Sequence, residues 1–285
     1  MNKVLCSTGT FIGRLNNFDY KLIGPYSGRI NCDGYEMMIE PFWNTAEQLR
    51  EIAGCVAGFN LNFETLHADK SIGDLISRNE SGDLNEALRR FDLNCETASK
   101  IGAKLVVLHL WGGSASDKNI DFNIKVFETL LEIAERYGVT ITVENVVCNT
   151  RSPLEHLCAL YKIYGDRVKF IIDVRHAEFH KSLKKICETE YLWKNVLHTH
   201  IADYKGGYMD WTKLRPVLRP GTGDVDFTYF FDFLKRIKYE GSLTLEAGAR
   251  NADGTMTDDS FSLLFFDTLN ESLDFIYRNI KNLPI

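Results

Sequence analysis

Two short apolar stretches of this chain each end on a carboxylate that can bind a metal ion. Residues 139–143 lead to Glu144, and residues 170–172 lead to Asp173, with His176 three residues further on. Apolar runs of this length, set between glycine and polar residues, are typical of strands buried on both faces of a parallel sheet. A carboxylate is costly inside a core but useful at the mouth of an active site. We therefore interpret Glu144 and Asp173 as ligands of one metal ion.

Four more side chains of this kind stand at or just past the end of a strand-like segment: His67, His109, His200 and Glu246. A single buried histidine or glutamate is usually a structural residue, but six at equivalent positions favour a common site. The segments expected to be strands are 3–7, 34–39, 59–65, 103–108, 139–143, 170–172, 195–200 and 242–245.

Segments with helical periodicity lie between these strands. Thr45 with Gln48 three residues later forms a capping-box signature. Ser152 followed by Pro153 is typical of a helix start, because the first turn leaves its N–H groups unbonded and proline has none. Strands and helices thus alternate along the chain. The segments expected to be helical are 45 to 54 or 58, 83–101, 121–137, 152–164, 181–193, 226–239 and, as one or two helices, 259–282.

Three of the joints between a helix and the next strand have the same form: KIGAKLVVLH, RYGVTITVE and KYEGSLTLE. Each has a basic residue near the negative end of the helix dipole and a glycine suited to a left-handed C-cap, namely Gly102, Gly138 or Gly241. Eight strands alternating with helices favour a single (β/α)8 TIM barrel over residues 1–285 rather than a doubly wound sheet. Active sites of such barrels lie at the C-terminal ends of the strands, where the six side chains fall.

The composition narrows the class of protein. A length of 285 residues suits one barrel, and a net charge of −6 without a basic block argues against binding nucleic acid through its phosphates. No apolar run approaches the roughly 18 residues of a membrane span, and Met1-Asn2-Lys3 leads into strand-like sequence rather than a signal peptide. The seven cysteines are dispersed and include no C-x-x-C pair. We expect a cytoplasmic protein with reduced cysteines; its oligomeric state is open, and a homo-oligomer is compatible with the sequence.

In six segments the chain resembles the xylose-isomerase-like TIM-barrel superfamily, and in particular its sugar (phosphate) isomerase/epimerase branch. Each segment alone is a weak signal, but the order and spacing of the set are fairly specific. The segments are VLHLWGG (107–113), TVENV (142–146), IIDVRHA (171–177), HTHIAD (198–203), PGTGDVDF (220–227) and GSLTLEA (241–247).

The resemblance implies a substrate contact by His176 and a divalent metal ion, most often Mn²⁺, held by four ligands: Glu144, Asp173, His200 and Glu246. Three carboxylates and one imidazole suit hard or borderline divalent cations, so Mg²⁺, Co²⁺ and Zn²⁺ are alternatives to Mn²⁺. The set lacks a thiolate, which argues against a structural zinc site.

Proton transfer next to a carbonyl is the chemistry that this set suits. The metal ion would polarise a sugar carbonyl and stabilise an enediolate oxygen, which lowers the pKa of the neighbouring C–H group. Glu144 and Glu246, on the fifth and eighth strands, would then act as an acid/base pair, one removing the proton and the other returning it. We hypothesise that the protein is a metal-dependent isomerase or epimerase of a small sugar or sugar phosphate.

Four other residues are expected near the substrate. His67 and His109 are expected either to contact the substrate or to support the metal ligands. The resembling epimerases commonly carry an arginine about six residues after the metal-binding histidine; Lys205 occupies that neighbourhood here and is expected to replace it. Trp111 lies in a loop after a strand and is expected to line the sugar ring, although ordinary loop packing explains it nearly as well.

Two features of the later motifs have competing interpretations. His198 and His200 are two residues apart in one expected strand, so they share a face unless a bulge intervenes. We take His200 as the ligand and His198 as its support. Gly221 and Gly223 suit either a phosphate cradle or a tight turn, and a tight turn is the commoner use of a lone Gly-x-Gly.

Three alternatives to an isomerase remain open. Dehydratases and lyases of a sugar or cyclitol derivative use much the same metal platform. The AP endonucleases of this superfamily carry an Asp-x-His pair before the Gly-x-Gly turn, where this chain has Arg215 and Arg219 in LRPVLRPGTG, so a multi-zinc DNA-repair site is disfavoured. A non-catalytic sugar-binding protein is hardest to reconcile with two carboxylates placed for proton transfer.

Overall fold

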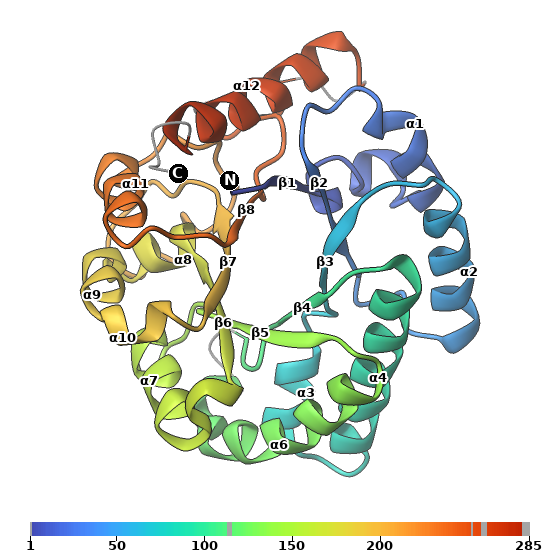
Figure 1. Cartoon of the computed structure of the whole chain (residues 1–285), viewed down its shortest axis with the longest axis vertical. Helices are drawn as coiled ribbons and strands as arrows, with labels where there is room; N and C mark the ends of the chain where they lie inside the picture. Colours follow the sequence, from blue (N-terminus) through green and yellow to red (C-terminus); the bar gives the residue numbers. More distant parts are fainter. Residues whose placement is uncertain (1, 113–115, 252, 258–260, 281–285) are drawn as a thin grey trace. The chain divides into compact units, whose positions relative to one another are not determined.

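The computed structural model describes residues 2–112, 116–251, 253–257 and 261–280. Its eight strands form one closed barrel, in which the order of the strands around the barrel is their order along the chain (Figure 1). Parallel pairing joins β1 to β8, β3 to β4, β4 to β5, β5 to β6 and β7 to β8, which confirms the expected (β/α)8 class. The strands are β1 (Val4–Ser7), β2 (Gly34–Met38), β3 (Phe63–His67), β4 (Leu105–Leu108), β5 (Thr140–Glu144), β6 (Lys169–Asp173), β7 (Val196–Ile201) and β8 (Ser242–Leu245).

The contacts within the chain divide it into two compact units. The first, which we call the terminal unit, comprises Met1–Tyr35 together with Ile172–Ile285. The second, the central unit, is Glu36–Ile171. Strand β6 begins in the central unit and ends in the terminal unit. A single domain over residues 1–285 stays a prediction.

Helices of the central unit run along the outer side of its strands (Figure 1). Two predicted helix starts are confirmed, because the Thr45 hydroxyl accepts a hydrogen bond from the Gln48 N–H and the Ser152 hydroxyl accepts one from the Glu155 N–H. α3 lies in a segment for which the sequence predicted no helix. The helices are α2 (Ala46–Ala57), α3 (Ile72–Arg78), α4 (Asp83–Ile101), α6 (Ile120–Arg136) and α7 (Pro153–Tyr164), with 3-10 helices η4 (Asp117–Asn119) and η5 (Gly165–Arg167).

The terminal unit departs from the prediction in more than one place, because Ile23–Ser27 and Val174–Phe179 form helices where the sequence predicted none. The segment predicted as one helix over 181–193 forms two, because the backbone of Thr189 is not helical (φ −83°, ψ 59°). The ends of the last predicted helix, at residues 259–260 and 281–282, lie outside the described residues. The helices are α1 (Ile23–Ser27), α8 (Val174–Phe179), α9 (Leu183–Glu188), α10 (Glu190–Trp193), α11 (Phe227–Arg236) and α12 (Leu263–Ile280), with 3-10 helices η1 (Thr8–Thr10), η2 (Arg14–Asn16) and η3 (Tyr20–Leu22).

The three glycine joints do not all work in the same way. Gly102 and Gly138 are left-handed, with φ of 85° and 65°, as predicted. At the third joint the prediction is wrong, because the left-handed residue is Lys238 (φ 52°) and not Gly241. Glycine is required at 241 for space instead, since a Cβ atom there would lie 2.1 Å from the Tyr239 hydroxyl oxygen.

Apolar side chains on the helices fill the space against the strands in each unit. Phe91 and Phe127 of the central unit, and Phe230 and Phe265 of the terminal unit, are fully buried. Helices α4, α6 and α12 bury one face and expose the other. In the described part of the chain, none is long and apolar enough to cross a membrane.

Candidate metal centre

Asp173, His200 and Glu246 lie together in the terminal unit. Their ligand-competent atoms, one carboxylate oxygen or ring nitrogen from each, are within 4.8 Å of one another. The His200 Nδ1 and Glu246 Oε2 atoms are 3.3 Å apart. Asp173 and His200 are fully buried, and the Glu246 side chain is 12% exposed. Three of the four predicted ligands therefore form one cluster.

Strand register brings His200 and Glu246 together. β7 and β8 pair with His200 opposite Thr244 and Ile201 opposite Leu245, and the Glu246 N–H donates to the Ile201 carbonyl (3.1 Å). Residues opposite each other in a parallel pair, and alternate residues along one strand, point to the same face. His200 lies opposite Thr244, and Glu246 follows Thr244 by two residues. His200 and Glu246 therefore share a face.

Asp173 is held by a helix cap. It is the last residue of β6 and the N-cap of α8, where its Oδ1 accepts a hydrogen bond from the His176 N–H (3.0 Å). The chain therefore turns from strand to helix at Asp173, which fixes the carboxylate at the strand end. The His176 Nδ1 atom lies 3.5 Å from the other oxygen, Oδ2. His176, the predicted substrate contact, is thus placed beside a predicted ligand.

This donor set fits a divalent cation. Asp173 and Glu246 carry carboxylate oxygens within 4.8 Å of each other, and two carboxylates this close repel while both are ionised. A bound cation removes that repulsion. Carboxylate oxygens suit Mg²⁺ and Mn²⁺, and imidazole nitrogen suits zinc, so the mixed set is compatible with the ions expected from the sequence.

His198 lies on the same strand face as His200, with their ring centroids 5.2 Å apart. Its ring nitrogens contact the Ser242 Oγ (2.7 Å) and the Thr244 Oγ1 (2.9 Å) of the neighbouring strand. Both nitrogens are thereby engaged and the residue is fully buried, which fits the supporting role predicted for it.

The central unit holds a second cluster, made by His67, His109 and Glu144, again with ligand-competent atoms within 4.8 Å of one another. The His109 Nε2 is 2.7 Å, and the His67 Nε2 3.4 Å, from the same Glu144 Oε2. Burial lowers the pKa of His109 to about 3, although the charge of Glu144 raises it. The ring is therefore neutral at neutral pH. Two imidazoles thus lie against one carboxylate.

Register also explains the central cluster. Val107 pairs with His67 on one side and with Thr142 on the other. His109 follows Val107 by two residues, and Glu144 follows Thr142 by two, so all three cluster residues share a face. His67 is the last residue of β3 and not a residue past its end, because the strand predicted at 59–65 lies at Phe63–His67.

Arg175 joins the terminal cluster to a loop. Its Nη2 lies 2.6 Å from the His176 Nε2 and 3.9 Å from the Asp173 Oδ2, and its Nη1 donates to the Leu214 carbonyl (3.2 Å). It is 7% exposed. No role was predicted for Arg175, although it stands between two predicted site residues in IIDVRHA.

Arg215, whose role the sequence left open, is the exposed member of a group of three arginines. The side chain is exposed, yet burial lowers the pKa of its guanidinium, which also feels the charges of four neighbours: Arg175, Glu246, Arg250 and Asp173. Three guanidinium groups and two carboxylates therefore act on one another around Arg215.

Arg250 belongs to a segment that packs on the same loop. It donates a hydrogen bond to the Gly254 carbonyl (2.8 Å), and Gly254 packs so closely on Pro216 that a Cβ atom would lie 2.1 Å from the proline Cγ. Because Pro216 follows Arg215, the chain near residue 250 supports the loop that carries Arg215.

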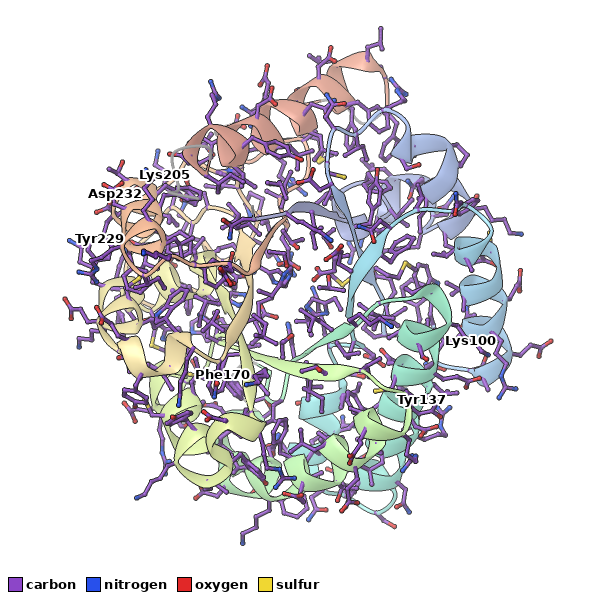
Figure 2. The ribbon with its side chains drawn as sticks, viewed as in Figure 1. Lys100, Tyr137, Phe170, Lys205, Tyr229 and Asp232 are labelled. Carbon is purple, nitrogen blue, oxygen red and sulfur yellow. The ribbon has the colours of Figure 1, made fainter. Side chains whose placement is uncertain are left out.

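Two predicted substrate contacts lie outside the clusters. Lys205 is exposed, and Figure 2 shows it in the region of α11, where Tyr229 and Asp232 are labelled. Trp111 is fully buried, and its indole N–H donates to the Val146 carbonyl (2.9 Å). The packing alternative therefore accounts for Trp111.

Asp203 organises the Gly-x-Gly turn. Its Oδ2 accepts hydrogen bonds from the N–H groups of Gly221 (2.9 Å) and Gly223 (2.8 Å), and its Oδ1 accepts one from Val225 (3.0 Å). Burial raises the pKa of Asp203, while these backbone hydrogen bonds lower it. Because the amides already bind a carboxylate, they do not cradle a phosphate, and the tight-turn interpretation is confirmed.

Comparison with known proteins gives one family and one curated relative. A family model described as a xylose isomerase-like TIM barrel matches residues 28–265. An uncharacterized protein of Methanocaldococcus jannaschii is 28% identical over 180 residues, which are 57% of this chain and 59% of that protein. The match therefore spans less than two thirds of the relative's length.

Several solved structures share the fold over nearly the whole chain. The 3-keto-D-glucoside 4-epimerase of E. coli has a TM-score of 0.67 at 17% identity, covering 98% of this chain and 100% of that chain. The D-psicose 3-epimerase of Clostridium cellulolyticum H10, solved with D-tagatose, has a TM-score of 0.68 at 15% identity over 98% and 99%. The IolI protein, solved with a zinc atom, has a TM-score of 0.67 at 18% identity over 99% and 100%. At these identities the likeness is one of fold, whereas the family match covers most of the sequence: the chain belongs to the xylose isomerase-like TIM-barrel family.

Proposed function

We propose that the protein is a divalent-metal-dependent isomerase or epimerase of a small sugar or sugar phosphate, acting by proton transfer through an enediolate. The observation that carries the proposal is the cluster of Asp173, His200 and Glu246 at the ends of their strands. Such a cluster fits a divalent cation and keeps a carboxylate within reach of a substrate held beside it. The epimerases among the solved structures of the same fold support this choice of reaction.

Glu144 is the proposed fourth ligand. In the central unit it pairs with Ile171 across β5 and β6, and Asp173 follows Ile171 by two residues on the same strand. Because alternate residues of a strand point to one face, this register directs Glu144 and Asp173 to the same face of their strands. That shared direction supports one ion for both carboxylates.

Mn²⁺ is the proposed ion, with Mg²⁺, Co²⁺ and Zn²⁺ as alternatives. Carboxylates with a single imidazole suit Mn²⁺, while the zinc atom in the IolI structure supports zinc. Bound between the carboxylates, the ion supplies Lewis-acid polarisation of a sugar carbonyl, which makes the adjacent C–H group more acidic.

The chain's own residues hold the sugar and move the proton. Glu144 and Glu246 form the proposed acid/base pair: one takes the proton from the carbon next to the carbonyl, and the other returns a proton. Return to the opposite side of that carbon gives an epimer, and return to the neighbouring carbon gives an isomer. His67, His109 and His176 lie beside the carboxylate ligands and donate hydrogen bonds to sugar hydroxyls in this proposal.

The arginines favour a sugar with an anionic group. When a bound ion neutralises the carboxylates, the positive charges of Arg175, Arg215 and Arg250 are left around the loop at 214–216. Guanidinium groups bind phosphate or carboxylate through paired N–H donors. Arg215 is the one of the three that is exposed, which suits it to contact such a group.

Small sugars are the proposed partners, without nucleic acid or membrane, and the proposed location is the cytoplasm. The net charge of −6 supports a protein that does not bind nucleic acid. All seven cysteines lie in the described part of the chain and none is in a disulfide, which supports a reducing compartment. A homo-oligomer is compatible with the proposal.

A panel of ketoses and ketose phosphates in D₂O tests the proposed reaction. The protein is stripped with a chelator, reloaded with Mn²⁺ and mixed with each sugar, and NMR follows deuterium at the carbon next to the carbonyl. We expect metal-dependent deuterium incorporation together with an epimer or an aldose. Loss of water or cleavage of a bond would instead assign the dehydratase or lyase alternative. A ligand-induced rise in melting temperature without any exchange would assign a sugar-binding protein.

A further inference from the structure

A third cluster of metal-competent side chains lies in the central unit, and the proposed reaction uses none of its members. Asp117 belongs to η4, between β4 and α6; Cys148 follows β5; and His156 is in the first turn of α7. One ligand-competent atom of each lies within 4.8 Å of the others, and all three residues are buried. Three segments that are distant in sequence therefore meet at one point.

His156 is the residue that points to a ligand. It is fully buried, and neither its Nδ1 nor its Nε2 has a hydrogen-bond partner among the residues that the structure describes. The Asp117 Oδ2 is 3.8 Å from the Nε2, which is too far for a hydrogen bond. Trp111 packs against the ring at a centroid distance of 4.8 Å. A buried imidazole with two unbonded nitrogens is uncommon and calls for an ion or a water molecule.

Only one of the two carboxylate oxygens of Asp117 accepts hydrogen bonds within the described residues. Its Oδ2 accepts hydrogen bonds from the N–H groups of Asn149 (3.0 Å) and Thr150 (2.6 Å), and from the Thr150 hydroxyl. Its Oδ1 is buried and has no hydrogen-bond partner within the described residues. The Cys148 sulfur lies 2.6 Å from the Arg151 carbonyl oxygen. The same short loop thus positions the carboxylate and the thiol.

We propose that Asp117, Cys148 and His156 bind a Zn²⁺ ion, separate from the ion proposed at the strand ends. Thiolate, imidazole and carboxylate together suit zinc rather than Mg²⁺ or Mn²⁺. Two ligand atoms on one zinc ion lie about 3.3 Å apart in tetrahedral geometry and at most about 4.4 Å apart. The 3.8 Å between the His156 Nε2 and the Asp117 carboxylate lies within this range, and Oδ1, which has no hydrogen-bond partner within the described residues, is the oxygen open to the ion.

A zinc ion here ties together the segments that follow two strands of the central cluster. Asp117 comes after β4 and His109, whereas Cys148 comes after β5 and Glu144, so the ion positions these loops and takes no part in proton transfer. Three protein ligands leave a fourth position to solvent or a carbonyl oxygen. On binding, the Cys148 thiol releases its proton to solvent and the thiolate forms the bond to zinc.

Cobalt substitution tests this site through a signal that the strand-end ligands cannot give, because none of those ligands contains sulfur. The metal-free protein is loaded with Co²⁺, and the near-ultraviolet absorption of thiolate-to-cobalt charge transfer is recorded. We expect the band in the wild type, its loss in Cys148→Ser, and its retention in Cys158→Ser, whose residue lies on the same helix as His156. A cobalt-loaded wild type without the band, or a band that persists in Cys148→Ser, overturns the proposal.

Zinc content and cysteine reactivity give independent measurements. His156→Gln should lower the bound zinc by one equivalent per chain, whereas Asp173→Asn should leave this zinc in place. If Cys148→Ser does not fold, alkylation of the wild type decides: a chelator should speed modification of Cys148 and leave Cys158 unchanged. Equal reactivity of Cys148 with and without chelator contradicts the site. None of these measurements involves turnover, so their failure is distinct from failure of the proposed sugar reaction.

Discussion

The strand-end clusters of the two units differ in charge. In the central unit two imidazoles lie against the single carboxylate of Glu144, with the Nε2 atoms of His109 and His67 at 2.7 Å and 3.4 Å from its Oε2. In the terminal unit one imidazole stands with two carboxylates, those of Asp173 and Glu246. The side chains of Arg175 (3.9 Å) and His176 (3.5 Å) also lie near the Asp173 Oδ2, but the two carboxylates still repel each other while both are ionised. This difference makes the terminal cluster the stronger candidate for holding a cation, and it makes the two histidines of the central cluster candidates for orienting Glu144, the proposed fourth ligand.

The largest effect is expected at Glu246. Glu246→Gln should slow deuterium exchange by about 10³-fold at saturating Mn²⁺, since general acid–base catalysis contributes about 10²–10⁴-fold. The exposed Glu240, just before β8, provides a matched control, and Glu240→Gln should keep the wild-type rate. Full exchange by Glu246→Gln with the ion bound would remove Glu246 from the mechanism.

A smaller effect is expected at Arg215, one of the three arginines near the terminal cluster. Arg215→Gln should weaken binding of a ketose phosphate by about 10–100-fold, because hydrogen bonds to charged groups contribute about 1.5–3 kcal/mol. Binding of the neutral ketose should not change. Arg219→Gln is the control, because Arg219 pairs with Glu271 (3.2 Å). Equal losses for both sugars would show that the charge of Arg215 does not select the substrate.

His67 tests the orienting role of the central cluster. His67→Asn should raise KM by up to about tenfold, the value of one neutral hydrogen bond of about 0.5–1.5 kcal/mol. The affinity for Mn²⁺ should stay close to that of the wild type. A steady-state titration with sugar and a separate titration with Mn²⁺ distinguish the two quantities. Loss of Mn²⁺ binding with unchanged KM would show that His67 binds the metal ion and does not orient Glu144.

His109 gives a pH dependence with a defined sign. Burial lowers the pKa of His109 to about 3, against about 6.5 in an unfolded chain. Between these values the unfolded chain binds a proton that the folded protein does not, so this residue makes stability fall as the pH decreases. The slope is at most about 1.4 kcal/mol per pH unit and vanishes above the unfolded value.

His109→Asn should therefore lose less stability than the wild type on acidification. Urea unfolding of the two proteins in the presence of a chelator, compared at neutral and at mildly acidic pH, measures the difference. Parallel changes in both proteins would mean that His109 is not held neutral by burial.

The sequence predicted the elements that depend on local signals. Helix α4 has the predicted bounds, Asp83–Ile101, because its apolar spacing and the left-handed Gly102 lie within the segment itself. The role of Gly241 was predicted wrongly, since the requirement for glycine there comes from Tyr239 and from the Leu197 carbonyl oxygen, which would lie 2.6 Å from a Cβ atom at residue 241. Contacts of this kind depend on tertiary packing and leave no local pattern.

The site follows the same division between local and tertiary signals. Asp173, His200 and Glu246 lie at or near the C-terminal ends of strands, which placed them at one end of the barrel, and the resemblance of the motifs grouped them as ligands. Arg215 is placed by a loop that Arg175 and the chain near residue 250 support. Lys205 was predicted from its offset to His200, and its contact with substrate stays a prediction.

Titration of Mn²⁺ into the chelator-treated protein, followed by the electron paramagnetic resonance of the unbound ion, tests the metal centre most directly. We predict one tightly bound Mn²⁺ per chain in the wild type. Asp173→Asn, whose amide oxygen can still cap α8, should fold normally and bind Mn²⁺ more than about 100-fold more weakly, because even residues behind the ligands contribute about 10–100-fold. A wild type without a tight site, or an Asp173→Asn variant that binds Mn²⁺ as the wild type does, would contradict a metal centre built on Asp173, His200 and Glu246.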